Sequence, residues 1–263
     1  MSSIAVVRKD RVKAMSLNEN GSVATLQTRD GGASNEAGGA GEGVPSGYGA
    51  YTCVIDACAY GRSALSTLAR RQLGGEVISL ASPQAQQDWP RSVLMLPVRA
   101  LVYRLPQSLG AALDALMFLK RFLLRQSGQL GVVASVLLLT NLPAFWVYGT
   151  LRSISGSELN LQAIFVVPVR TSPAGVTAAL AFRNDAQRLS VLAARTPASK
   201  RRSLTAREAE VLHDLLHHGR TIAAQARRKC TMAKTLYTQQ RSAMRKLGVS
   251  SLCGLVRWRG GTR

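Results

Sequence analysis

The chain is short of acidic residues, because 34 Lys and Arg side chains stand against 14 Asp and Glu, giving a formal net charge of +20. The excess is uneven: residues 1–50 are balanced, whereas residues 195–263 hold 16 basic and 3 acidic side chains. A surface that is merely solvated usually mixes both signs. A dense positive field attracts polyanions, so we expect either nucleic acid or an anionic membrane surface as the partner.

Cysteines are few, and no two of them have the C-x-x-C spacing of a metal or redox pair; they are Cys53, Cys58, Cys230 and Cys253. We therefore expect neither a zinc site nor a structural disulfide. No signal peptide is visible at the start of the sequence. A reducing cytoplasm is the compartment that fits these features best.

The residue patterns that carry catalysis are also missing. No Ser-His-Asp, Cys-His or paired-carboxylate arrangement can be defended, and no glycine loop for phosphate follows a predicted strand. His213 and His217 are four residues apart, but no third metal ligand is evident, so an exposed helix face is the favoured interpretation. We expect no enzyme, no cofactor and no metal.

No apolar run is long enough and pure enough for a clear membrane span. Residues 130–149 come nearest, but Thr140, Asn141 and Pro143 interrupt a stretch that a bilayer requires to be apolar for about 20 residues. A buried strand, a loop and a helix explain the same letters. The alternative function is a membrane-associated interaction protein, with residues 130–149 inserted and the basic tail on anionic lipid.

The first 50 residues are expected to be a flexible extension, to which we assign no function. Residues 31–49 are rich in Gly, Ser and Ala and have almost no large apolar side chains, so burial cannot offset the entropy of ordering them. From Tyr51 the composition changes to short apolar runs that alternate with amphipathic stretches.

This alternation over residues 51–194 predicts a parallel sheet with helices on both faces, in the order of a flavodoxin-like α/β domain. The predicted strands cover residues 53–55, 77–80, 93–96, 132–139 and 163–169. The predicted helices cover residues 63–73, 109–124, 144–154 and parts of 173–192. Residues 195–202 are polar and basic, and they form the expected linker to the last domain.

Residues 203–263 predict a small all-α domain. Thr205 and Glu208 have the spacing of a capping box at the start of a helix, and Gly219 is placed to end it. A short helix is expected over 221–229, a third over 234–247 with Gly248 as its stop, and a fourth over 251–258 with Leu252, Leu255 and Val256 along one side.

These motifs resemble the LuxR/FixJ-type helix-turn-helix transcription regulators. The family pattern is met by Leu204 to Leu212 (LTAREAEVL), Gly219, Lys234-Thr235-Leu236 and Lys246 to Val249 (KLGV). The stretch from Lys234 to Gly248 looks most like the Rcs-type capsule and envelope regulators. Cys53 to Leu68 is similar to the first strand and helix of the auxiliary Rcs-type members, whose receiver-like domain is not phosphorylated.

The helix over 234–247 is the one expected to enter the major groove of DNA, where base edges can be told apart. Its predicted inner face consists of Leu236, Gln240, Ala243 and Leu247. Tyr237, Thr238 and Arg241 then point outward, and the resemblance places them at base-contacting positions; a partly buried aromatic is the alternative for Tyr237. The predicted phosphate contacts are Arg228, Lys234, Arg245 and Lys246, although a solvated helix face explains such residues as well.

The supporting helix departs from the family pattern. Gln225 and Lys229 occupy inner positions where the family usually has Ile and Leu, and Met232 stands where it has Ser. Burying an amide or an ammonium without a partner is costly. We therefore expect a supporting helix that is shifted, looser or completed by another subunit, and DNA binding as a homodimer or as a heterodimer with another LuxR-type regulator.

The resemblance also implies which residues a phosphorylated receiver needs: an acidic cluster after the first strand, an Asp after the third and a Lys after the fifth. Here Asp56 stands alone, Pro97 follows the predicted third strand, and Pro168-Val169-Arg170 follow the fifth. Thr140 matches the position of the switch hydroxyl. We expect a pseudo-receiver that neither binds Mg²⁺ nor accepts a phosphoryl group.

Overall fold

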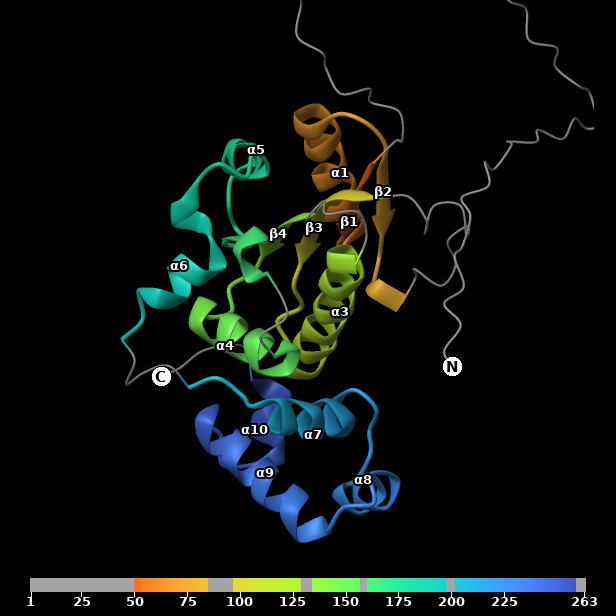
Figure 1. Ribbon diagram of the computed structural model, residues 1–263, viewed down its shortest axis with the longest axis vertical. Helices are drawn as coiled ribbons and strands as arrows, with labels where there is room; N and C mark the ends of the chain where they lie inside the picture. The colour runs from red at the N-terminus through yellow and green to blue at the C-terminus, as the bar shows by residue number, and fades with distance from the viewer. Residues whose placement is uncertain (1–49, 85–96, 129–133, 157–159, 198–201, 259–263) are drawn as a thin grey trace, which may run out of the picture. The chain divides into compact units, whose positions relative to one another are not determined.

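Five parallel strands between residues 51 and 167 form a single sheet (Figure 1). We call this sheet and the helices that cover it the sheet domain. The computed structural model describes residues 50–84, 97–128, 134–156, 160–197 and 202–258. The strand order is β2-β1-β3-β4-β5, which confirms the predicted flavodoxin-like topology. The strands are β1 (Tyr51–Ile55), β2 (Val77–Leu80), β3 (Val98–Arg104), β4 (Ser135–Leu139) and β5 (Ile164–Val167).

Helices cover both faces of this sheet. On one face α1 and α5 pack against alternate strand residues such as Leu137 and Leu139, and on the other α3 and α4 pack against Val136 and Leu138. A strand that is buried on both sides is apolar along most of its length, as in residues 136–139 of β4. The helices are α1 (Ala59–Leu73), α3 (Leu109–Gly128), α4 (Ala144–Ser155), α5 (Pro173–Leu180) and α6 (Leu189–Ala194), with 3₁₀ turns η2 (Leu161–Ala163) and η3 (Asp185–Gln187).

The third strand differs from the prediction. Residues 93–96 lie outside the described residues, and the strand that pairs between β1 and β4 is Val98–Arg104. Pro97 therefore precedes this strand instead of following it, and its carbonyl accepts from the Tyr51 amide. The apolar run of β3 is hard to recognise in the sequence because an arginine lies near each end of the strand. Exposed Arg99 donates to the Leu73 carbonyl, and Arg104 forms an ion pair with Asp56.

The apolar stretch over residues 130–149 contributes to the sheet domain. Its described residues contain β4, a turn, and the first part of α4, as the strand-loop-helix interpretation predicted. The Thr140 hydroxyl accepts from the Leu142 amide in the turn between them. Among the described residues, no helix combines the length and the apolar character that crossing a membrane requires.

Four helices follow within the described residues 202–258, which we call the helical domain, and local sequence signals account for the ends of these helices. Thr205 and Glu208 form the predicted capping box, in which the Thr205 amide donates to Glu208 Oε2 at 2.8 Å. Gly219 and Gly248 adopt positive φ angles of 63° and 69°, which favour glycine at these turns. The helices are α7 (Ala206–Leu216), α8 (Ile222–Arg228), α9 (Ala233–Lys246) and α10 (Leu252–Arg257).

The hydrophobic core of the sheet domain continues into these helices. The Trp146 ring of α4 lies 5.1 Å from the Trp258 ring, and the Leu204 amide donates to Thr150 Oγ1 at 3.3 Å. Two glycines allow the close approach: a Cβ on Gly149 would lie 2.5 Å from Ser203 Cβ, and one on Gly110 would lie 3.0 Å from Leu216 Cβ. α7 thus packs directly on α3 and α4.

The effect of Gly149→Ala on the free energy of unfolding should have opposite signs with serine and with glycine at position 203. In the natural chain Gly149→Ala should lower the free energy of unfolding by about 1–3 kcal/mol, because the new methyl overlaps Ser203. In a Ser203→Gly background the same change should raise it by about 0.5–1 kcal/mol, since alanine is the better helix former. Urea unfolding of the four proteins measures both values, and an equal effect in both backgrounds would refute the close contact.

Candidate nucleic-acid interface

Helix α9 has one buried and one exposed face. Leu236, Gln240 and Ala243 are buried, as is Leu247 just beyond the helix, so the predicted inner face is confirmed. These side chains pack against α7 and α8, which together support α9. The opposite face of α9 is therefore held in a fixed direction toward solvent.

The three predicted base-reading residues share that outer face. The Tyr237 residue is 53% exposed, which argues against a buried aromatic. Thr238 and Arg241 are exposed too, and Thr238 Oγ1 donates to the Lys234 carbonyl. Arg241 has no ion pair with any residue that the structure describes, so its guanidinium donors are available to a partner.

The four predicted phosphate contacts fall into two pairs. Lys234 and Arg245 are exposed on α9, without an acidic partner among the described residues. Lys246 Nζ instead lies 2.7 Å from Glu208 Oε2, and Arg228 Nη2 lies 3.3 Å from Asp214 Oδ1. The second pair is therefore already engaged by carboxylates of α7, and its contact with phosphate stays a prediction.

The polar residues inside the supporting helix α8 have partners, which the sequence did not reveal. Gln225 is fully buried, and its Nε2 donates to the carbonyls of Val211 and Arg220 at 3.2 and 3.1 Å. Lys229 Nζ lies 2.9 Å from Asp214 Oδ2. Only the Gln225 Oε1 atom stays without a hydrogen bond in this described group. The expected loosening of α8 is thus offset by contacts to α7.

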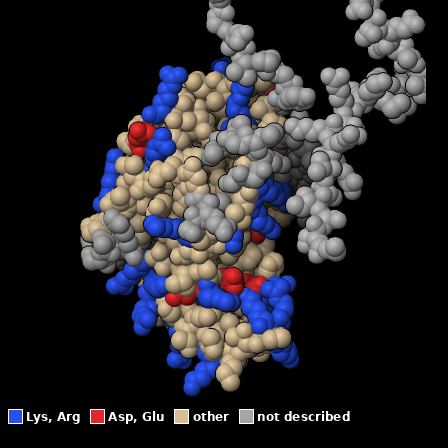
Figure 2. Space-filling model, viewed as in Figure 1, with Lys and Arg blue, Asp and Glu red and all other residues tan. Residues whose placement is uncertain are grey.

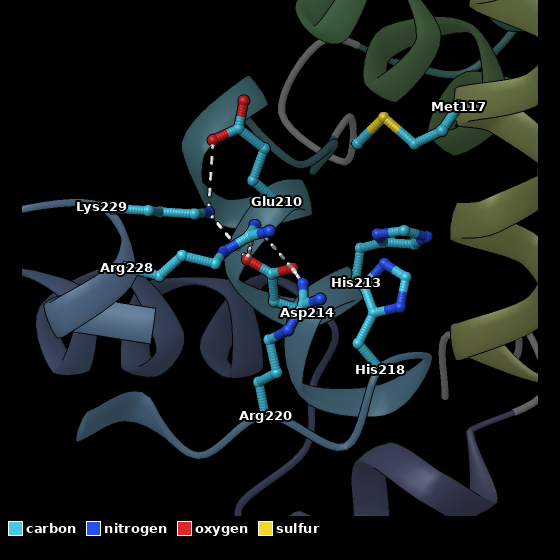
Figure 3. Close-up of a pocket in the computed structure, with 8 residues that line it drawn as sticks. All are labelled: Met117, Glu210, His213, Asp214, His218, Arg220, Arg228 and Lys229. Atoms are coloured by element: carbon cyan, nitrogen blue, oxygen red, sulfur yellow. Dashed lines mark hydrogen bonds and ion pairs between the residues drawn. The ribbon is translucent and has the colours of Figure 1, made fainter. Parts of the chain in front are cut away.

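Asp214 is the centre of these contacts (Figure 3). It is 4% exposed, and Arg220, Arg228 and Lys229 all approach its carboxylate. Burial alone would raise the pKa of Asp214, but hydrogen bonding and charge from Lys229, with Arg220 and Arg228, hold it below its ordinary value. Three cations therefore share the Asp214 carboxylate, and one of them, Lys229, also lies 3.6 Å from Glu210 Oε2.

The carboxyl edge of the sheet has a different arrangement from that of a phosphate-accepting receiver. Asp56 follows β1, is 3% exposed, and receives the Cys58 amide on Oδ1 at 2.9 Å. Arg104, the last residue of β3, brings Nη1 to 3.4 Å from Asp56 Oδ2. Residues 98–108 contain no acidic residue, and Pro168 follows β5. A cation therefore sits where the resemblance would place further carboxylates.

His213 is less exposed than the sequence suggested, whereas His217 is exposed as expected. The His213 side chain is only 15% exposed, because Asp114 of α3 covers it with a carboxylate oxygen 3.3 Å from Nε2. Burial would raise the pKa of Asp114, but the His213 and Gln84 hydrogen bonds and the nearby imidazoles lower it overall. The interpretation of an exposed helix face is therefore wrong for His213, since the packing of α3 on α7 was not visible in the sequence.

The bond between Glu208 and Lys246 should make stability depend on pH. Burial raises the pKa of Glu208, but the Lys246 and Thr205 hydrogen bonds outweigh it and lower the value below 4.5. A lowered pKa in the folded state means that the stabilisation is present above about pH 4.5 and is lost as the pH falls through the folded value. Glu208→Gln should reduce the free energy of unfolding at pH 7 by about 1.5–3 kcal/mol, with a smaller reduction at lower pH.

Urea unfolding at several pH values checks this, with Lys246→Met and the double variant completing a cycle. The two single changes should be strongly non-additive, because either one removes the same bond. Additive effects at pH 7 would contradict the pairing.

Comparisons with known proteins extend these observations to the fold. No protein-family model matches the chain, and no curated protein matches it. A structure of RcsB from Salmonella enterica serovar Typhimurium, bound to promoter rprA with the phosphomimetic BeF₃⁻, is similar with a TM-score of 0.51 and 20% identity. The match covers 81% of this chain and 100% of that one.

Two further structures are less similar. The same RcsB bound to promoter P1flhDC has a TM-score of 0.47 and 20% identity, over 80% of this chain and 98% of that one. Full-length FixJ from B. japonicum has a TM-score of 0.32 and 22% identity, over 79% and 94%. The assignment of the fold therefore rests on the rprA complex. The chain shares the fold of that RcsB structure, a five-stranded parallel α/β domain followed by a helix-turn-helix domain.

Proposed function

We propose that the protein is a DNA-binding transcription regulator that uses α9 to read the major groove. The observation that carries this proposal is the outward face of α9, where Tyr237, Thr238 and Arg241 are exposed opposite a buried inner face. An α-helix fits the major groove, and an arginine can donate two hydrogen bonds to one guanine there. The similar RcsB structure is itself a promoter complex.

The charge of the surface supports the same partner. Figure 2 shows Lys and Arg side chains across the visible face of the described residues, with few Asp and Glu between them. Lys234 and Arg245, which have no acidic partner among those residues, are the foremost candidates for phosphate contacts. Arg228 and Lys246 are assigned the same role, in which phosphate would share them with Asp214 and Glu208.

The sheet domain is proposed to act without phosphorylation. Arg104 neutralises Asp56, no carboxylate stands in or directly after β3, and no lysine follows β5 in residues 168–172. We assign this domain to dimerisation or to binding a partner regulator. The proposed division of the chain is an extension over residues 1–50, a pseudo-receiver domain over 51–194, a linker over 195–202 and the DNA-binding domain over 203–263.

Helix α10 supports binding in pairs. Leu252 and Val256 are 52% and 62% exposed and lie four residues apart, so both are on one apolar side of this helix. The buried residue Leu255 fixes α10 against the core. A second subunit that covers Leu252 and Val256 would bring two reading helices onto one DNA, either as a homodimer or with another LuxR-type regulator.

Arg241→Ala should remove sequence preference while Lys234→Ala should not. Duplexes selected from a random pool by the natural full-length chain supply the preferred and non-preferred sites. We expect Arg241→Ala to reduce the preference between them by about 5–150-fold, because a bidentate base contact discriminates by about 1–3 kcal/mol. Lys234→Ala should weaken both sites alike and lower the slope of log affinity against log salt by about 0.9.

Fluorescence anisotropy at several salt concentrations measures all three proteins, and circular dichroism establishes that they are folded. Unchanged preference in folded Arg241→Ala would remove that residue from base reading. Failure of the natural chain to select any sequence would remove the proposed function itself.

A small acyl-phosphate donor should not label the protein. With acetyl phosphate and Mg²⁺, intact-mass measurement of the full chain should show no added phosphoryl group, since Arg104 occupies the edge where one would be accepted. A phosphate-accepting response regulator, treated in parallel, is the positive control. A phosphoryl adduct on Asp56 or any other Asp would overturn the pseudo-receiver assignment.

A further inference from the structure

All three histidines of the chain gather at the contact between α7 and α3. The ring centroids of His213, His217 and His218 are 4.9–5.0 Å apart, and the rings of His213 and His217 are nearly parallel. The Nε2 atoms of His213 and His217 lie 3.3 and 3.7 Å from the same oxygen, Oδ1 of Asp114. Two imidazole nitrogens, one from α7 and one from the residue that follows it, therefore converge with one carboxylate oxygen from α3.

These separations suit a tetrahedral metal site. Ligand atoms at the zinc bond lengths of about 2.0–2.2 Å are about 3.3–3.6 Å apart when they sit at corners of a tetrahedron. The three ligand atoms of this group all lie within 4.8 Å of one another. Two histidines and one carboxylate form a known type of zinc ligand set, in which water takes the fourth position.

Asp114 is oriented for this role by a neighbour. Gln84 Nε2 donates to the other carboxylate oxygen, Oδ2, at 2.6 Å, so Oδ1 is directed toward the histidines. Such hydrogen bonds to a ligating carboxylate fix its orientation at metal sites. Asp114 and His213 are also shielded, with side chains 14% and 15% exposed.

A second grouping, of His213, Asp214 and His218, is a weaker candidate. Its ligand atoms are also within 4.8 Å, but Asp214 already binds Arg220, Arg228 and Lys229. A metal ion there would have to displace these cations from the carboxylate (Figure 3). Asp114 has no Lys or Arg ion pair with the residues that the structure describes.

We propose that Asp114, His213 and His217 form a binding site for a divalent transition-metal ion of the zinc type, which joins α3 of the sheet domain to α7 of the helical domain. Imidazole and carboxylate together favour such ions over Mg²⁺ or Ca²⁺. Because the ligands come from both domains, the bound ion stabilises their contact. The site is independent of DNA reading by α9 and can exist without it.

The test uses the untagged full-length protein after treatment with a chelator. Zinc chloride is titrated against it by calorimetry and by competition with a chromophoric chelator, and about one equivalent should bind. His217→Gln and Asp114→Asn should each weaken zinc binding by at least ~10-fold. His218→Gln is the matched control, since it removes an adjacent imidazole outside the proposed ligand set, and it should bind as the natural chain does.

Two measurements distinguish zinc at this site from zinc held by thiols or by the neighbouring imidazole. Cys58, Cys230 and Cys253 are exposed thiols, so cobalt(II) replaces zinc in a spectroscopic titration, and a thiolate-to-cobalt charge-transfer band would reveal cysteine ligation. Zinc should raise the Tm of the natural chain and of His218→Gln, but not that of His217→Gln, which changes a partly exposed side chain. Absence of saturable binding, a thiolate spectrum, or equal loss in His218→Gln would each overturn the proposal.

Discussion

Two buried carboxylates on α7, Glu208 and Asp214, hold the helical domain together. Residues 195–263 contain only three acidic residues. All three lie on α7, and each forms an ion pair. Glu208 reaches forward to the end of α9 through Lys246, and Asp214 reaches α8 through Lys229 and Arg228. Without these two carboxylates, the positive side chains of α8 and α9 would repel one another where both helices pack on α7.

This arrangement divides the basic residues into two groups with different tasks. Arg228, Lys229 and Lys246 form ion pairs with carboxylates of α7 and hold α8 and α9 against it. Lys234, Arg241 and Arg245 have no such partner in the described residues, and they face solvent on α9. The excess of positive charge therefore has a structural part as well as a part available to a polyanion, and the total charge alone cannot tell the two apart.

Local patterns predicted the helical domain well because its signals are close together in the sequence. Thr205 and Glu208 are three residues apart, and Leu236, Gln240 and Ala243 repeat at helical spacing. The sheet was predicted where its strands are continuous apolar runs, as in β4, and not in β3, where Arg99 and Arg104 interrupt the pattern. Residues 93–96, the strand expected instead, lie outside the described part of the chain.

The contacts that sequence reasoning missed join residues distant along the chain. Arg104 and Asp56 are 48 positions apart, and His213 and Asp114 are 99 apart. No local period relates such pairs, because only the strand order and the packing of α7 on α3 bring them together. The Val211 partner of Gln225 was missed for a related reason: Val211 lies on the neighbouring helix α7 and supplies a backbone carbonyl, which has no signature in the side-chain sequence.

These distant contacts also determine how the sheet is connected to the C-terminal helices. A receiver that is phosphorylated changes state at the carboxyl edge of its sheet, but here Arg104 and Asp56 already satisfy each other at that edge. The two domains instead meet through α3 and α4 on one side and α7 and α10 on the other. Since α7 also carries the carboxylates that position α8 and α9, a ligand that acts on the α3 contact acts on the support of α9. Helix α7 therefore connects the sheet domain to both α8 and α9.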